Sequence, residues 1–243
     1  MSGGVGPTCD ITLPKEEPPH QPDEVAAAKP PARRTFFTFR QLNALAVAVV
    51  LSASGMVSAE EFAFVIFSVA YIYFISKVAF PPASPVPEPP VYGDKNTILS
   101  LYAVVGAVIG LFLPIAYIFE GILEGDKEGI KAAAPHVFLL ASQMFMEGLT
   151  FSSRFSLPVR VLVTVFYNAM RILSVMEWVR NEFSKVETGY GIGGSGSGRR
   201  VCVGRALAAA NMGFWSFNLF GFLLPFYLPK AFKLYYSNSK FRD

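Results

Sequence analysis

The stretch Ile98–Phe119, ILSLYAVVGAVIGLFLPIAYIF, decides the fold class of this chain. It runs for 22 residues without a charged side chain. A helix of about 20 apolar residues covers the hydrocarbon core of a bilayer, which is roughly 30 Å thick. The run therefore predicts a transmembrane helix, and Pro114 is expected to kink its C-terminal half.

Five further hydrophobic runs flank this stretch. Together the six runs cover residues 41–57, 62–80, 98–119, 132–151, 159–179 and 206–228. Hydrophobic residues make up 52% of the 243 residues and charged residues only 16%, against about 25% in soluble domains. We therefore predict an all-α, polytopic transmembrane helical bundle over residues 36–235, with about six helices in contact with the lipid bilayer.

Residues 1–35 form a Pro-rich N-terminal tail with five acidic and no aromatic residues. Such a segment cannot bury enough apolar surface to offset its ordering entropy, so we predict that it is disordered. A transit peptide is poor in acidic residues, so we favour the plasma membrane or an endomembrane over the plastid. Residues 236–243 are expected to form a short C-terminal tail.

The distribution of Lys and Arg bears on orientation. If all six runs span and the N-terminus is cytoplasmic, 12 of these residues lie on the cytoplasmic side and 7 on the other. The loop after run 159–179 does not fit this arrangement. If that run lies in the interface instead, the loop moves inside but the basic C-terminal tail moves outside. We favour six spans and a cytoplasmic N-terminus.

Several classes of function find no support in the residues. The net charge is only +3 and has no dense basic block, which argues against nucleic-acid binding. The two cysteines, Cys9 and Cys202, cannot form a disulfide framework or by themselves a four-ligand zinc site, and the two histidines, His20 and His136, are too few for a di-iron centre. No GxSxG or HExxH motif is present. We predict no metal and no cofactor, and lean against an enzyme.

Polar side chains form a stripe along run 132–151 and another along run 159–179. Steps of three, four and seven residues keep each set on one helical face. The members are His136, Gln143, Glu147, Thr150 and Arg154 on the first run, and Arg160, Thr164, Asn168 and Arg171 on the second. A short connection predicts an antiparallel hairpin. Folding the chain about residue 155 places Glu147 near Thr164 and within reach of Arg160 and Asn168, Gln143 near Asn168, and Arg171 between His136 and Gln143.

Three interpretations of these stripes stay open. The first is a polar path or ligand site lined by His136, Glu147 and Arg171, in which Glu147 titrates. The second, which we favour, is an interhelical hydrogen-bond network that fixes the hairpin, because a lone charge at mid-bilayer costs roughly 2.5–3.5 kcal/mol. The third is an amphipathic helix at the membrane surface formed by run 159–179.

Other signals point to helix packing. Gly106 and Gly110 form a GxxxG pair, and Asn211 and Asn218 share one face of the last run. We favour packing inside the bundle over homodimerisation for the glycines, and interhelical hydrogen bonds for the asparagines. Cys202 is a candidate for reversible palmitoylation, although a plain reduced thiol is favoured. The segment 189–198 is interpreted as a flexible Gly-rich loop and not as a dinucleotide fingerprint.

The segments Phe37–Ala46 and Leu51–Ser58, FTFRQLNALA and LSASGMVS, resemble a plant family of small multispan membrane proteins known as the DUF7733 family. The opening MSGGVGPT and the segment SKVAFP from Ser76 resemble it as well. The resemblance covers nearly the whole chain. It implies a plant source and an integral membrane location, but no activity and no site residues.

The sequence thus favours a non-enzymatic scaffold or an accessory subunit of a membrane transport or trafficking complex. The alternative is a small transporter or channel whose polar path is lined by the Glu147 stripe. A membrane-embedded enzyme is the third and least favoured class. The expected partners are the lipid bilayer and either other membrane proteins or further copies of the chain.

Overall fold

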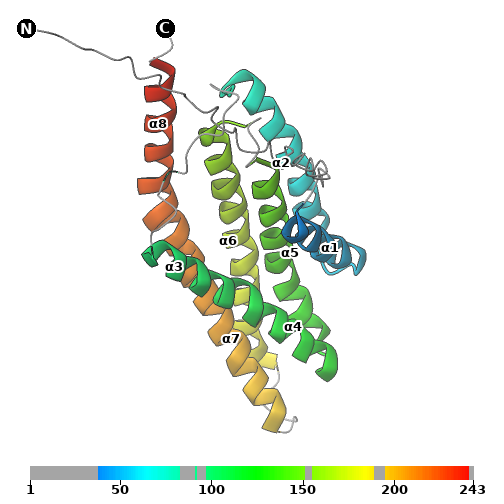
Figure 1. The fold of residues 1–243 in the computed structure, drawn as a ribbon. Helices are drawn as coiled ribbons and strands as arrows, with labels where there is room; N and C mark the ends of the chain where they lie inside the picture. Colours follow the sequence, from blue (N-terminus) through cyan, green and yellow to red (C-terminus); the bar gives the residue numbers. More distant parts are fainter. Residues whose placement is uncertain (1–37, 83–90, 92–96, 151–154, 189–194, 241–243) are drawn as a thin grey trace, which may run out of the picture. The chain divides into compact units, whose positions relative to one another are not determined.

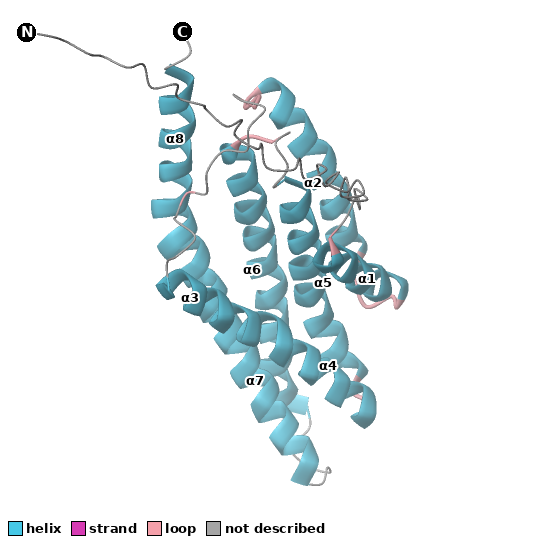
Figure 2. Cartoon of the chain, in the orientation of Figure 1, coloured by secondary structure: helices cyan, strands magenta, loops and turns pink. Residues whose placement is uncertain are grey.

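The computed structural model describes residues 38–82, 91, 97–150, 155–188 and 195–240 (Figure 1). These residues form six continuous helices, and Figure 2 shows no strand among them. The elements are α1 (Phe39–Ala53), α2 (Ala59–Val78), α3 (Thr97–Ala107) continued by the π-helix η1 (Val108–Phe112) and α4 (Leu113–Glu124), α5 (Lys127–Thr150), α6 (Leu157–Thr188), and α7 (Ser195–Ser216) continued by the π-helix η2 (Phe217–Tyr227) and α8 (Leu228–Lys240). The predicted all-α class is confirmed.

Local sequence signals explain where the first two helices start and stop. Thr38 with Gln41, and Ser58 with Glu61, form capping boxes that satisfy free amides at the starts of α1 and α2. Gly55, which adopts a φ of 69°, lies just beyond the end of α1. The apolar run expected to reach residue 57 therefore ends as a helix at Ala53.

Four helices are long and apolar enough to cross a membrane in the described part of the chain. They comprise Ala59–Val78, Thr97–Glu124, Leu157–Lys185 and Gly198–Ser237. The protein is thus a helical multispan membrane protein. Neither α1 nor α5 is among these four helices, so the prediction that all six runs span stays a prediction for these two. At 1.5 Å per residue the 15 residues of α1 reach about 22 Å, short of a hydrocarbon core of about 30 Å.

The helix α5 is too polar to qualify as a span by composition. Its packing explains how its polar residues are accommodated. It contacts α1, α2, α4, α6 and η1, so neighbours cover it on several sides. Figure 1 shows α5 and α6 side by side along their lengths. Polar side chains of α5 such as His136, Ser142 and Gln143 are buried as a result. Enclosure by other helices removes the cost of facing lipid.

The helix α6 is the most enclosed of the four candidate spans. Over half of its apolar window, 56%, is buried inside the protein, compared with 17–39% for the other three. This burial, and the place of α6 among the four candidate spans, favours a spanning helix over a helix lying at the membrane surface. The helix also extends beyond that run, from Leu157 to Thr188, because its polar end packs against charged partners described below.

The remaining differences concern segment ends. The last run, expected over 206–228, forms part of one continuous helix that begins at Ser195 and ends at Lys240. Its start includes residues 195–198 of the expected Gly-rich loop. The predicted N-terminal tail, Cys9, His20, Arg154 and residues 189–194 of that loop lie outside the described residues.

Candidate functional site

The α5–α6 hairpin brings together the polar stripes of the two helices. Gln143 donates a hydrogen bond from Nε2 to Oε1 of Glu147 at 2.6 Å, and Thr164 donates from Oγ1 to the same oxygen at 3.0 Å. Arg171 donates from Nη2 to Oε1 of Gln143. The chain Arg171–Gln143–Glu147–Thr164 thus links α6 to α5 at two levels, as the folding of the hairpin predicts. We call these four residues, together with Trp215, the polar network.

Arg171 is the most enclosed charge of the polar network, because its side chain is fully buried. Its guanidinium carbon lies 4.1 Å from the ring centroid of Trp215 on α7, a cation–π contact. Nε and Nη1 have no hydrogen-bond partner among the described residues. The indole therefore replaces part of the solvation that the cation loses on burial, while Gln143 accepts its one hydrogen bond.

His136 binds the backbone of a neighbouring helix. Its Nε2 lies 2.8 Å from the carbonyl oxygen of Gly110 in η1, and its ring is fully buried near Trp178 and Trp215. A carbonyl can only accept a hydrogen bond, so Nε2 carries the proton and Nδ1 is left as an acceptor. Nδ1 has no partner in the described part of the chain.

Pro114 explains why η1 needs side-chain donors. A proline has no amide hydrogen, so the carbonyls of the preceding turn lose a backbone donor. The amide of Leu113 donates to the carbonyl of Val108, the π-helical pattern, and leaves the carbonyl of Ile109 open. Asn211 donates from Nδ2 to that oxygen at 3.0 Å. Just before the proline at which a kink is expected, the helix thus has a π-helical segment whose open carbonyls accept hydrogen bonds from Asn211 and His136.

Two residues of the expected network are directed elsewhere. Asn168 is fully buried and donates from Nδ2 to the carbonyl of Trp215 at 3.2 Å, so it faces α7 and not Gln143. Arg160 donates from Nη2 to the carbonyl of Phe155 at 3.2 Å, close to the start of its own helix. Spacing on α6 gave the face of each residue but not the helix that covers it.

The residues interpreted as packing positions meet at one interface, between α3–η1 and α7–η2. An added methyl group at Gly106 would lie 2.9 Å from the ring of Phe214, and one at Gly110 would overlap Trp215. Asn218 accepts a hydrogen bond from the Tyr102 hydroxyl at 3.0 Å. Cys202, in contrast, is an exposed free thiol on α7.

A second polar assembly, which sequence reasoning missed, lies where α4, α5, α6 and α7 meet. Glu182 is fully buried and accepts hydrogen bonds from the Tyr117 hydroxyl at 2.7 Å and from Lys185 at 2.8 Å. Arg200 pairs with Asp126 at 2.9 Å and stacks over the Tyr117 ring at 4.3 Å. We call this assembly the charged cluster; its members are Tyr117, Glu120, Glu124, Asp126, Glu182, Lys185, Arg199 and Arg200.

Asp126 has a second role at the start of α5. Its Oδ1 accepts a hydrogen bond from the amide of Gly129 at 2.8 Å, so the side chain caps the helix. Burial acts to raise the pKa of this carboxyl, but the Gly129 amide, Arg200 and Lys185 together hold the pKa below its usual range. The loop carboxylate therefore stays charged and ties three helices together.

The signal for the charged cluster was present in the sequence as opposite charges in two distant loops. Acidic residues occur in the segment 120–128 and basic residues in 185–205. Their separation of about 75 residues, as between Arg200 and Asp126, gives no periodicity that could pair them. Only the antiparallel course of the helices brings the two segments together.

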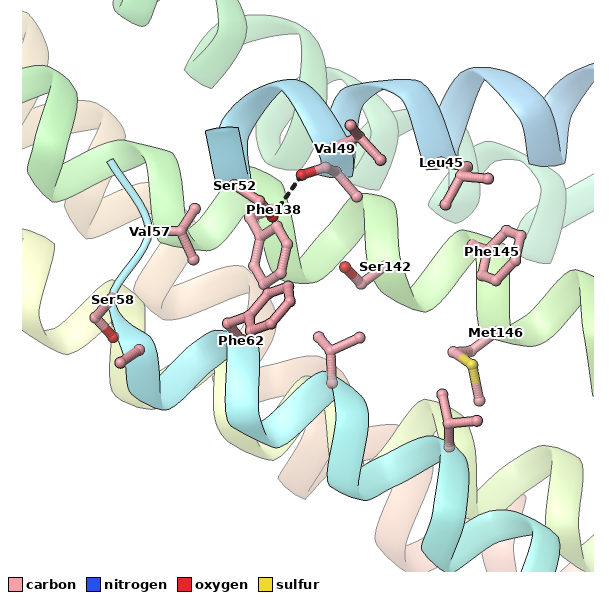
Figure 3. Close-up of a pocket in the computed structure, with 14 residues that line it drawn as sticks. Leu45, Val49, Ser52, Val57, Ser58, Phe62, Phe138, Ser142, Phe145 and Met146 are labelled. Atoms are coloured by element: carbon pink, nitrogen blue, oxygen red, sulfur yellow. Dashed lines mark hydrogen bonds between the residues drawn. The ribbon is translucent and has the colours of Figure 1, made fainter. Parts of the chain in front are cut away.

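Two cavities border α5 away from the polar network. The first, of about 750 Å³, is an apolar groove between α1, α2 and α5 (Figure 3). The second, of about 860 Å³, shares Ser58 with the first and is lined by Glu60, Glu61, Glu128, Glu177 and Lys131 among others. Neither cavity is lined by His136, Glu147 or Arg171. The polar network is thus separate from both.

The chemistry available at these sites is binding and charge pairing. No group of three or more His, Cys, Asp and Glu side chains within the described segments is arranged to hold a metal ion. The acidic and basic groups of the charged cluster pair with one another, and the polar network links α5 with α6.

Comparison with known proteins gives a family. No curated protein and no solved structure matches the chain. A family model described as a domain of unknown function (DUF7733) matches residues 37–236, a range that includes both polar assemblies and both cavities. The chain therefore belongs to the DUF7733 family.

Proposed function

We propose that the protein is a non-enzymatic membrane component, a scaffold or an accessory subunit of a membrane transport or trafficking complex. The observation that carries this proposal is the use of the buried polar groups. Arg171, Gln143 and Glu147 bind one another across α5 and α6, and His136 and Asn211 bind backbone carbonyls of η1. Such groups fix the arrangement of helices rather than line an open route.

The outer faces of the spans support the same proposal. Large apolar side chains remain exposed on α2, α3 and α4, for example Phe67, Leu101 and Leu123. In a bilayer these faces contact lipid or the helices of another membrane protein. A helical bundle with broad apolar faces suits an accessory subunit. The plant source and the cytoplasmic N-terminus are further proposals that rest on the sequence alone.

A small transporter is the second candidate, and one observation favours it. Nε and Nη1 of Arg171, and Nδ1 of His136, are buried without a partner among the described residues. Buried polar atoms of this kind are uncommon and attract water or an ion. In that account Glu147, which is only partly buried, exchanges a proton or an ion with the path.

One paired experiment separates the two candidates. The wild type and Glu147→Gln are reconstituted into liposomes for proton-flux and ion-flux assays, and in parallel are purified in mild detergent to identify co-purifying membrane proteins. Glu124→Gln, at an exposed carboxylate outside the polar network, serves as the control. A scaffold shows no flux and keeps the same partners in all three proteins. A wild-type flux that only Glu147→Gln abolishes, in a folded protein, establishes the transporter.

A further inference from the structure

The apolar groove is enclosed by three helices but opens toward the lipid phase. Figure 3 shows Leu45 and Val49 of α1 above the groove, Phe62 of α2 below it, and Phe138 and Met146 of α5 behind it. Exposed apolar residues such as Leu42, Val50 and Ile66 continue along α1 and α2 outside the groove. Its volume of about 750 Å³ falls within the range of about 300–1,000 Å³ typical of small-molecule sites.

The depth of the groove matches one leaflet of a bilayer. Its lining follows α2 from Ser58 to Val69 and α5 from Phe138 to Met146. At 1.5 Å per residue the α2 side is about 16 Å long, close to half of a hydrocarbon core of about 30 Å. The only hydrogen bond drawn in Figure 3 is donated by Ser52 to the carbonyl of Ala48, within α1. The groove therefore offers an acyl chain an apolar slot of fitting length.

The second cavity begins where the groove ends, at Ser58, and has a different character. We call this second cavity the acidic mouth. Its lining comes from the start of α2 and from α5 and α6, and it includes four carboxylates and one ammonium: Glu60, Glu61, Glu128, Glu177 and Lys131. Two of the carboxylates are engaged, Glu61 by the capping box of α2 and Glu177 by Arg180 at 3.6 Å. The mouth thus has an excess of negative charge next to a single cation.

A buried hydroxyl in the mouth points independently to a ligand. Ser174 lines this cavity, and the residue is 5% exposed. Its Oγ has no hydrogen-bond partner in the described structure, although a helical serine readily bonds to a carbonyl of the preceding turn. Asn181, about two turns further along the same face of α6, also lines the mouth and has an unpartnered Oδ1. Both oxygens can accept a hydrogen bond from an N–H donor.

We propose that the apolar groove and the acidic mouth together bind one membrane phospholipid whose head group has a primary ammonium and no carboxylate, a phosphoethanolamine lipid. An acyl chain fills the groove between α1, α2 and α5. The ammonium donates to the carboxylates of Glu60 and Glu128 and to the Ser174 hydroxyl, and the phosphate pairs with Lys131. This assignment is independent of the scaffold proposal, because the polar network lines neither cavity.

The lining of the mouth selects among head groups. A quaternary choline group has no N–H to donate and is recognised by aromatic faces, and none of the residues lining the mouth is aromatic. An anionic head group without an ammonium faces four carboxylates and only one cation. A primary ammonium forms charge-assisted hydrogen bonds to carboxylates and also satisfies a neutral hydroxyl. The phosphoethanolamine head group is therefore the fitting one.

The test uses the full chain in nanodiscs of phosphatidylcholine with a photoreactive lipid added at low mole fraction. The same diazirine-bearing acyl chain is carried by phosphatidylethanolamine, phosphatidylglycerol or phosphatidylcholine, and cross-linked peptides are identified by mass spectrometry. The ethanolamine probe is expected to label the groove residues of α1, α2 and α5 at least about tenfold more than the other two probes. A tenfold preference corresponds to a difference of about 1.4 kcal/mol in binding free energy. Equal labelling by the three probes, or labelling spread evenly over α3 and α4, overturns the proposal.

Variants separate the two parts of the site. Ala48→Phe fills the groove and should abolish labelling there, whereas Ala46→Phe, the same change on the exposed face of α1, should not. Val69→Trp fills the deep end and replaces Ala48→Phe if that variant does not fold. Glu60→Gln combined with Glu128→Gln should remove the preference for ethanolamine but keep acyl labelling, and Glu124→Gln should change neither. Labelling that survives both filling variants overturns the proposal, as does a co-purified protein that occupies the groove.

Discussion

His136 on α5 is hydrogen-bonded to the carbonyl oxygen of Gly110 on η1, with 2.8 Å between Nε2 and the oxygen. Gly110 lies four residues before Pro114, at the position whose carbonyl an α-helix would satisfy with the missing amide. A residue that resembles a catalytic or proton-carrying histidine is thus engaged with the backbone of its neighbour. Its free Nδ1 remains the one part of the ring that a water or ion could use.

Replacing His136 tests this role directly. His136→Leu leaves the Gly110 carbonyl buried without its side-chain donor, and we expect a loss of about 1–3 kcal/mol of unfolding free energy. His136→Gln retains an N–H donor and should lose less. Unfolding of the two variants in detergent, followed by tryptophan fluorescence, measures the difference. Equal stability of His136→Leu and the wild type would show that the hydrogen bond from His136 to the Gly110 carbonyl does not stabilise the protein.

The bond between Gln143 and Arg171 predicts a coupling between two substitutions. Gln143→Leu leaves a buried guanidinium without its acceptor, and should cost about 1.5–3 kcal/mol. Adding Arg171→Met removes the uncompensated charge, so the double variant should be more stable than the sum of the single changes predicts. A double-mutant cycle of unfolding free energies measures this coupling. Strict additivity would show that the two side chains do not depend on each other.

Close packing at Gly110 predicts an asymmetry between two glycines. Gly110→Ala places a methyl group against the Trp215 ring and should destabilise the protein by about 1–3 kcal/mol. Gly213→Ala, which meets nothing within 4 Å, should leave the protein as stable or stabilise it by up to about 1 kcal/mol. Thermal unfolding of both variants checks the contrast. If Gly110→Ala instead changes only the oligomeric state, the glycine pair serves contacts between copies.

Asp126 predicts a pH dependence at the charged cluster. Asp126→Asn retains the cap of α5 but removes the charge facing Arg200 and Lys185, and should cost about 1 kcal/mol at neutral pH. Because the folded pKa lies below the usual value of about 3.9, the contribution is complete above that value and disappears as the pH falls through the lower folded pKa. Unfolding of both proteins from neutral to acidic pH measures it. A difference that disappears already near neutral pH would contradict this assignment.

Periodicity on α5 and α6 predicted much of the fold around the polar network. The step from Gln143 to Glu147 and the short connection placed Glu147 beside Thr164, where the structure has it. Periodicity describes one helix at a time and cannot say which third helix covers the pair. Trp215, which stacks on Arg171 from 44 positions further along the chain, was therefore missed.

Hydropathy along the chain predicted two spans, α1 and α5, that do not meet the length and composition expected of a spanning helix. The run at 41–57 reached the minimum length only by including Gly55, where the backbone leaves the helix. The polar character of α5 is tolerated because neighbouring helices enclose it. Enclosure is a tertiary property, so hydropathy along the chain could not separate a lipid-facing span from this inner helix.

The course of the α5–α6 hairpin is tested most directly by cysteine accessibility in intact membranes. Single cysteines replace Lys127, Ser184, Ala79 and Ser237 in a background in which Cys9 and Cys202 are serine. If the hairpin crosses the bilayer with the polar network inside, Lys127 and Ser184 label from one side, and Ala79 and Ser237 from the other. Labelling of all four positions from a single side would contradict the account, because the network would then lie outside the membrane interior.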